Sequence, residues 1–460
     1  MIGYLGLARE TFDIKFAKKK FIEAIKILQF CTKNTIGINH LITNDDITKN
    51  TIQFFKKKNC DKIIIFQTTF TDAKFILHFA QILKKPICIV AFQEPRTGKR
   101  LRLNSICGLN LGMHSLIKNN IVPDFIIHKN NINSTKLFFS KFIKKNNKQN
   151  KRTKWKKIHL YNVNFPQKLS IAKKQTIGII GKRPDGFDTC DYDKVEIKNK
   201  LNFSLKNLKL DRLFEESKNT ANTKIKDTKK TITKYLKGTK KLHQVEFNKS
   251  ISIYHGLESL KEKHKLDAFA VKCWPEMFTD YGCASCGPMA MMNEKKISCA
   301  CEVDVLGCIS CNILNQLNGN PSLLIDIVDV DKDDNSVVFW HCGLAPISMA
   351  KKGTARSGIH SNRKKPLLHD FSLKPGTITI FRVSKAQNIL QFFLLKGKVM
   401  DRPNSFSGTS GVISFGKNSA YKVENMFKGG LEHHVAFTYG NVYDQLVQLG
   451  NKMKIPTYTL

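Results

Sequence analysis

Short apolar runs alternate with amphipathic stretches through the first third of the chain, beginning with IGYLGL and FAKKKFIEAIKILQF. Unbroken β-branched runs, such as residues 63–65, are typical of strands buried on both faces of a parallel sheet. The stretches between these runs have the apolar spacing of helices. The alternation predicts a doubly wound parallel-sheet α/β domain over residues 1–172. No GxGxxG follows its first strand, so the pattern gives no reason to expect a dinucleotide.

Two further domains are predicted after the polar, aperiodic stretch at residues 141–157, which is typical of a linker. The motif TIGIIGKRPDGFDTCDYD opens a second doubly wound α/β domain at residues 173–318, and its lysine-rich segment 202–262 should form solvated helices. Beyond Pro321, strand-like runs such as GTITIFRVS are separated by Gly, Pro and Asn turns. These runs predict a mainly β, barrel-like C-terminal domain at residues 319–460.

The charge balance is strongly basic, with 76 Lys and Arg against 37 Asp and Glu and a formal net charge of +39. Such an excess usually indicates a polyanionic partner. Here it is mostly lysine, spread along the chain with much Asn, Ile and Phe, as A/T-rich codons produce. A nucleic-acid site would concentrate Arg and aromatic residues in one segment. No nucleic-acid partner is therefore expected, and a basic nucleic-acid-binding protein remains one alternative.

The 13 cysteines are an odd number in a long chain and do not form the framework of a disulfide-stapled secreted domain. The N-terminus MIGYLGLARETFD lacks a basic segment followed by an apolar one, and no run approaches the length of a membrane span. A cytoplasmic protein with reduced thiols and no membrane association is expected.

Two carboxylates stand in apolar surroundings: Glu302 in CACEVDVLGC, and Asp326 in PSLLIDIVDV, at the predicted end of a buried strand. Burying a carboxylate is costly unless a cation or hydrogen-bond donors accompany it. Near the C-terminus, GGLEHHVAFTYG places His433 and His434 beside an apolar run and offers a nitrogen ligand. Oxygen and nitrogen donors together suit Mn2+ or a similar divalent cation better than a structural zinc. A lone strand-end Asp more often caps a turn, and a lone His more often packs, so these residues alone leave both possibilities open.

Several of these motifs resemble the L-fucose isomerase family and its shorter fucose-isomerase-like members. They are CEVDVLG, QLNGNPSLLID and the histidine segment, together with GKRPDGFDTCDYD and AVKCWPEMFTDYG, and the resemblance extends over most of residues 176–440. It implies that Glu302, Asp326 and His434 bind the metal. It also implies an aldose–ketose isomerase, an intramolecular oxidoreductase acting on a monosaccharide, in which both carboxylates move protons between C1 and C2. A homo-oligomer, trimer or hexamer, is implied as well, with residues 92–116 of a neighbour's first domain helping to close the site.

Three further residues are predicted to contact the sugar or to bind the metal. His341, in VVFWHCGLAP, resembles a ligand histidine of the L-arabinose isomerases, and is expected to be a fourth metal ligand or a sugar contact. Trp274 and Asn362 are expected to contact the sugar, because aromatic faces suit its C–H groups and amides suit its hydroxyls. The mixture of the two family patterns leaves the identity of the sugar open.

A zinc-stapled scaffold is the other alternative. Cys283-x2-Cys286 and Cys308-x2-Cys311 come near the spacing of a four-cysteine zinc site. However, the second pair lies in GCISCNILNQL, which reads as an apolar helix in which small thiols pack as hydrophobic residues. Packing is therefore the favoured interpretation of these cysteines.

Overall fold

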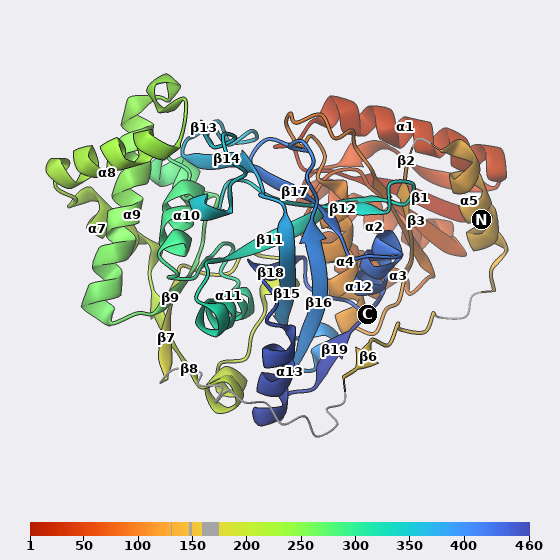
Figure 1. The fold of residues 1–460 in the computed structure, drawn as a ribbon. Coiled ribbons are helices and arrows are strands. Elements are labelled where there is room, and N and C mark those ends of the chain that lie inside the picture. The colour runs from red at the N-terminus through yellow and green to blue at the C-terminus, as the bar shows by residue number, and fades with distance from the viewer. Residues whose placement is uncertain (130, 147–149, 159–173) are drawn as a thin grey trace.

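The computed structural model describes residues 1–129, 131–146, 150–158 and 174–460, which form three β-sheets and their covering helices (Figure 1). The fold is mixed α/β, as predicted, with two parallel sheets followed by a large mixed sheet. The boundary predicted between residues 172 and 173 lies outside the described residues. One continuous core cluster contains residues from all three sheets, so they share an interior.

The first sheet is parallel, in the order β2-β1-β3-β4-β5. Its strands are β1 (Ile2–Leu7), β2 (Thr35–Ile42), β3 (Lys62–Gln67), β4 (Ile87–Phe92) and β5 (Asp124–His128). Helices α1 (Ile14–Cys31) and α5 (Ile132–Lys144) pack together on one face, and α2 (Asp45–Lys58), α3 (Lys74–Leu83) and α4 (Ser105–Lys118) cover the other. The predicted doubly wound arrangement is confirmed. Strand β2 was not expected, because this edge strand is only partly buried and lacks an unbroken apolar run.

The second sheet is also parallel, in the order β10-β9-β7-β8. It comprises β7 (Gln175–Ile180), β8 (Phe203–Leu208), β9 (Ala268–Val271) and β10 (Cys299–Ala300). Its longer helices are α7 (Leu210–Lys218), α8 (Asn222–Tyr235), α9 (Gln244–His264), α10 (Cys286–Glu294) and α11 (Val305–Asn318). The prediction that residues 202–262 are helical throughout is wrong at its start, because β8 pairs with β7 as an edge strand whose partly exposed residues hide the strand pattern.

The third sheet contains a closed ring of strands, which confirms the predicted barrel-like character. The ring runs β17-β12-β11-β18-β15-β16 and returns to β17 through the pairs Lys398–Ser414 and Val399–Ile413. Its strands are β11 (Ser322–Asp331), β12 (Ser336–His341), β15 (Gly376–Ser384), β16 (Gln391–Val399), β17 (Thr409–Ser414) and β18 (His434–Tyr439). Strands β13 (Arg356–Gly358) and β14 (Leu368–Ser372) extend one side, and β19 (Thr457–Thr459) and β6 (Lys156–Lys157) the other. Helices α12 (Ser419–Lys428) and α13 (Tyr443–Lys452) complete this part.

Among the residues described above, no helix combines the length and the apolar character needed to cross a bilayer.

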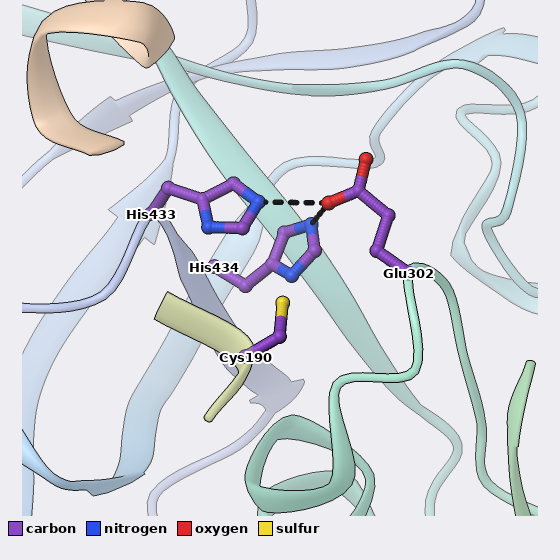
Figure 2. Close-up of side chains that lie close together, drawn as sticks. All are labelled: Cys190, Glu302, His433 and His434. Atoms are coloured by element: carbon purple, nitrogen blue, oxygen red, sulfur yellow. Dashed lines mark hydrogen bonds and ion pairs between the residues drawn. The ribbon is translucent and has the colours of Figure 1, made fainter. Parts of the chain in front are cut away.

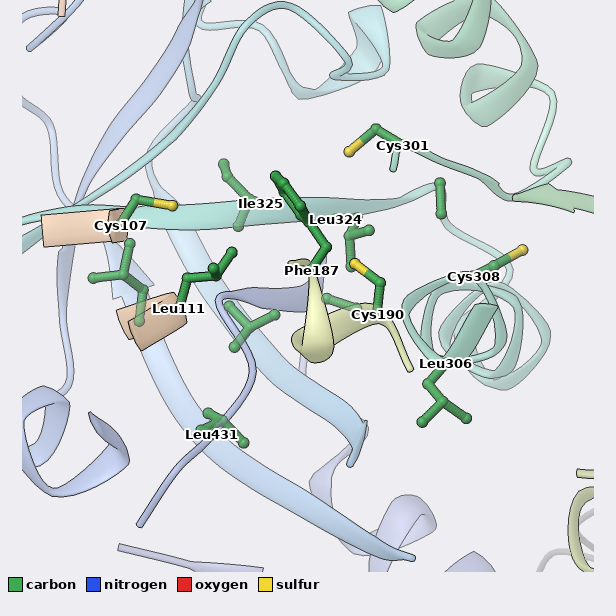
Figure 3. Packing of buried hydrophobic residues seen from close by; sticks show 14 of the residues in the cluster. Cys107, Leu111, Phe187, Cys190, Cys301, Leu306, Cys308, Leu324, Ile325 and Leu431 are labelled. Atoms are coloured by element: carbon green, nitrogen blue, oxygen red, sulfur yellow. The ribbon is translucent and has the colours of Figure 1, made fainter. Parts of the chain in front are cut away.

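The cysteines of the alternative zinc pattern lie in the packed interior. Cys308 and Cys311 are both buried on α11, as the apolar pattern predicted. Figure 3 shows Cys308 among its buried neighbours. Burial raises the pKa of the Cys308 thiol well above its usual value and that of Cys311 to about 12. The Cys308 thiol donates to the Ser298 carbonyl, with a sulfur–oxygen distance of 3.7 Å. These two side chains therefore have the surroundings of packing thiols.

Replacing Cys308 and Cys311 together by alanine should cost only packing, roughly 1–3 kcal/mol of unfolding free energy. Metal content, measured by elemental analysis, should stay as in the wild type. Cys60→Ala, which removes another buried thiol from the first domain, is the matched control. Loss of one zinc per chain from the double variant alone would favour the scaffold alternative.

Candidate active site

A single pocket lies where the three parts of the chain meet. It is lined by all six residues predicted to serve the metal or the sugar: Trp274, Glu302, Asp326, His341, Asn362 and His434. The predicted first-domain segment 92–116 also lines it, through Leu101, Asn104 and Cys107 of the same chain. Residues predicted from motifs in distant parts of the sequence therefore lie together in one pocket.

Glu302 occupies a sharp turn between β10 and α11. Both Glu302 and Val303 have left-handed backbone conformations, with φ of 57° and 56°. Such a conformation costs a non-glycine residue about 1–3 kcal/mol, and it persists mainly at functional sites. The turn directs the carboxylate into the pocket, where the indole nitrogen of Trp274 donates to Oε1 at 3.0 Å. Nε2 of His433 lies 3.0 Å from Oε2 (Figure 2).

Asp326 and His434 stand directly opposite each other on the antiparallel strands β11 and β18. Opposed residues share one face of a sheet, and here Nε2 of His434 lies 3.6 Å from Oδ1 of Asp326. The thiol of Cys107, from α4 of the first domain, donates to the same oxygen at 3.5 Å. The expectation that Asp326 ends its strand is wrong, because pairing with β12 continues β11 through Asp331.

Asp304 fixes the orientation of His434. Its Oδ2 lies 2.9 Å from Nδ1 of His434, and since a carboxylate accepts, Nδ1 carries the proton and Nε2 faces the pocket. The fully buried Arg382 of β15 donates to both oxygens of Asp304, at 2.7 and 2.9 Å. Asp304 also caps α11 by accepting from the Gly307 amide at 2.8 Å. A Cβ at Gly307 would stand 2.6 Å from Asp304 and 2.7 Å from Arg382, so the first turn of α11 requires glycine here.

The pocket shifts the pKa values of its ionisable groups in different directions. Burial opposes ionisation of Glu302, but the hydrogen bond from His433 and the charges of His433 and His434 outweigh it and lower the Glu302 pKa to about 2. Burial raises the pKa of Asp326. Burial likewise lowers the pKa of His341 to about 3, so its imidazole is neutral at pH 7. The pocket therefore combines carboxylates with a neutral imidazole.

Two carboxylates and a thiol lie near Nε2 of His434. This nitrogen lies 3.8 Å from Glu302 Oε2, 3.6 Å from Asp326 Oδ1 and 3.6 Å from Cys301 Sγ. The two separations from carboxylate oxygens exceed ordinary hydrogen-bond lengths. The contact with the Cys301 sulfur is a hydrogen bond. Among the described residues, two groups bring potential ligand atoms within 4.8 Å of one another, and they share His434: Cys190, Glu302, His433 and His434, and Cys301, His341 and His434. The predicted ligand Asp326 is in neither group.

Several pocket residues were not identified from the sequence. His341 contacts Cys301, with 3.1 Å between Nε2 and Sγ, and no pattern had singled out Cys301. His433 was noted only as the neighbour of His434, although it contacts Glu302 directly. Asp304 lies in the CEVDVLG motif, two residues after Glu302, but its link to Arg382 depends on a contact far along the chain.

Comparison with known proteins agrees with this architecture. The family described as "Fucose/sulfoquinovose isomerase, N-terminal domain" matches residues 3–146. The sulfoquinovose isomerase of Priestia aryabhattai is 28% identical over 99% of this chain and 98% of its own length. Those of Alkalicoccus urumqiensis and Clostridium sp. (strain MSTE9) are 27% and 25% identical, with at least 98% of each chain covered. The resemblance inferred from the motifs is thereby confirmed: residues 3–146 match the N-terminal domain of fucose and sulfoquinovose isomerases, and the chain is similar to sulfoquinovose isomerases over nearly its whole length.

Proposed function

We propose that this chain is a divalent-metal-dependent aldose–ketose isomerase whose substrate is sulfoquinovose or a closely similar hexose. The observation that carries the proposal is that Nε2 of His434 lies 3.8 Å from Glu302 and 3.6 Å from Asp326 in one pocket. The names of the similar sulfoquinovose isomerases support both the reaction class and the sugar.

The reaction moves a proton between C2 and C1 of an open-chain sugar through an enediol. It therefore needs one group that accepts a proton at one carbon and another that delivers a proton at the other. Glu302 comes from the turn after β10 and Asp326 from β11, so the two carboxylates approach His434 from different elements. In this proposal, they serve the two carbons separately.

Glu302, Asp326 and His434 would also hold the cation, which we propose to be Mn2+. When bound, such a cation supplies positive charge that stabilises the enediolate oxygens as a Lewis acid. Asp304 holds His434 with Nε2 toward the carboxylates, the arrangement by which a neighbouring carboxylate orients a metal-binding histidine.

Trp274, Asn362 and His341 are proposed as sugar contacts. Trp274 and Asn362 already have one partner each, because the indole donates to Glu302 and the Asn362 side-chain oxygen accepts from Arg100 at 2.9 Å. His341 is paired with Cys301 rather than with a carboxylate, which favours a sugar contact over a fourth ligand. The homo-oligomeric state, trimer or hexamer, and the cytoplasmic location remain proposals from the family resemblance and the reduced thiols.

His434→Ala and His341→Ala should therefore differ. Loss of Nε2 of His434 removes a ligand from a site with few protein donors, so Mn2+ affinity should fall by about 10–100-fold or more, and excess Mn2+ should restore activity only in part. His341→Ala should lower sugar turnover more than Mn2+ affinity. Titration of Mn2+ binding and steady-state kinetics on both variants provide the comparison. Equal, large losses of affinity would make His341 a ligand, and retained metal and activity in His434→Ala would contradict the proposed site.

A substrate screen tests the function as a whole. The purified chain, loaded with Mn2+, is incubated with sulfoquinovose, L-fucose, D-arabinose and L-arabinose, and the ketose is detected by NMR. We expect conversion of sulfoquinovose, loss of conversion with a chelator, and recovery with Mn2+. Metal analysis of the same protein separates the alternatives, since tightly held zinc without any conversion would favour a scaffold, and no metal and no conversion would favour the nucleic-acid binder.

A further inference from the structure

An arginine without an ion-pair partner faces the pocket. Arg363 is half-buried and follows β13 in the loop that also carries Asn362. Its guanidinium carbon lies 5.2 Å from the ring centres of both Trp274 and Phe278. Within the described part of the chain, no carboxylate forms an ion pair with it. A partly desolvated guanidinium without a counter-ion is unfavourable, and such a group is typically a site for an anion.

A second guanidinium lies over the same indole ring, that of Trp274. Arg9 follows β1, and its guanidinium carbon lies 5.2 Å from the ring centre of Trp274. Its position is fixed, because its side chain donates to Asp72 at 2.7 Å and its backbone amide donates to Thr69 at 2.8 Å. A guanidinium has five N–H donors, so the single contact with Asp72 leaves donors for a ligand. Burial lowers the pKa of Arg363, and the positive charge of Arg9 acts in the same direction.

Trp274 connects this pair to the reacting groups. The indole nitrogen at the ring edge donates to Glu302, while the two guanidinium groups lie over the ring itself. A sugar whose C1 and C2 lie at Glu302 and Asp326 can thus extend along the indole toward Arg9 and Arg363. The part of the substrate that reaches them is the opposite end of the carbon chain.

We propose that Arg363, assisted by Arg9, is the subsite for a singly charged oxyanion at C6 of the sugar, the sulfonate of sulfoquinovose. The inference rests on the proposed isomerase function. Guanidinium groups bind such oxyanions through charge-assisted hydrogen bonds. With the charge of Arg9 balanced by Asp72, the pair leaves one uncompensated positive charge, which matches a sulfonate better than a phosphate dianion. The subsite would thus select the substrate, while Glu302 and Asp326 perform the reaction.

The test compares Arg363→Met with the wild-type chain, both loaded with Mn2+. Methionine keeps the apolar stem over Trp274 and Phe278 and removes the charge. The substrates are sulfoquinovose, quinovose, which lacks the sulfonate, and glucose 6-phosphate. For sulfoquinovose, kcat/KM should fall by about 100-fold, mainly through a higher KM. For quinovose, kcat/KM should fall by about tenfold at most. The matched control is Lys364→Met, which removes the same charge from an exposed neighbour and should preserve the wild-type ratio between the two sugars.

Each outcome decides a separate point. Equal losses on sulfoquinovose and quinovose would overturn the subsite and leave the isomerase function standing. A wild-type preference for glucose 6-phosphate over sulfoquinovose would overturn the assignment to a sulfonate. If the wild type converts none of these sugars, the proposed function fails, and calorimetry of sulfoquinovose binding decides the subsite. Weaker binding to Arg363→Met would then support it, and equal or undetectable binding in both proteins would overturn it.

Discussion

Glu302→Gln is expected to lower kcat/KM for isomerisation at least about 100-fold, the usual scale for loss of a general base. The substitution keeps the volume of the side chain and its contact with Trp274, but it removes a negative charge and a proton acceptor. The fold should survive, because the turn that carries Glu302 is held by Asp304 and Arg382 rather than by the Glu302 carboxylate. Steady-state kinetics and circular dichroism measure the two effects.

The matched control for this change is Glu262→Gln, which makes the same substitution at an exposed position near the end of α9. It should leave kcat/KM within about twofold of the wild type, as expected for a surface change away from the site. Near-normal turnover of Glu302→Gln, with an unchanged Mn2+ requirement, would remove Glu302 from the proposed reaction.

Arg382→Met should cause the largest loss of stability, about 3–5 kcal/mol, the cost of breaking a buried ion pair. Arg382 is fully buried, binds both oxygens of Asp304, lies 3.8 Å from Glu432 and donates to the Thr189 carbonyl at 3.3 Å. Without the guanidinium, two carboxylates remain buried beside an apolar side chain. The shift of the urea unfolding midpoint, converted with the measured slope, gives the loss.

Arg402→Met is the control for that experiment. Arg402 pairs with Asp334 at 3.1 Å, but its side chain is 51% exposed, so its loss should cost at most about 1 kcal/mol. Similar midpoints for the two variants would show that the buried pair of Arg382 and Asp304 does not hold the barrel to α11.

The sequence predicted the elements whose burial leaves a simple pattern. Strand β3 appears as an unbroken apolar run because both of its faces are covered, whereas β2 and β8 are partly exposed edge strands and escaped notice. The barrel was foreseen from its many short strands, but the pairing of β16 with β17 that closes it depends on register, which composition does not encode.

The pocket residues divide in the same way, into those marked by a local sequence motif and those that only long-range packing brings together. Glu302, Asp326 and His434 were found because local motifs surround them. Arg9 and Arg363 are far apart in the sequence and both lie over the ring of Trp274, so no local pattern could associate them. Long-range contacts of this kind are fixed by the packing of the three sheets.

The measurement that tests the central claim most directly is isomerisation by the Mn2+-loaded wild type in D2O, followed by NMR of the ketose. If Glu302 and Asp326 serve the two carbons separately, the proton taken from C2 is not the one delivered to C1. Each turnover should then place one solvent deuteron at C1. Conversion with full retention of the original hydrogen, or no conversion of sulfoquinovose or the other sugars at all, would contradict the account.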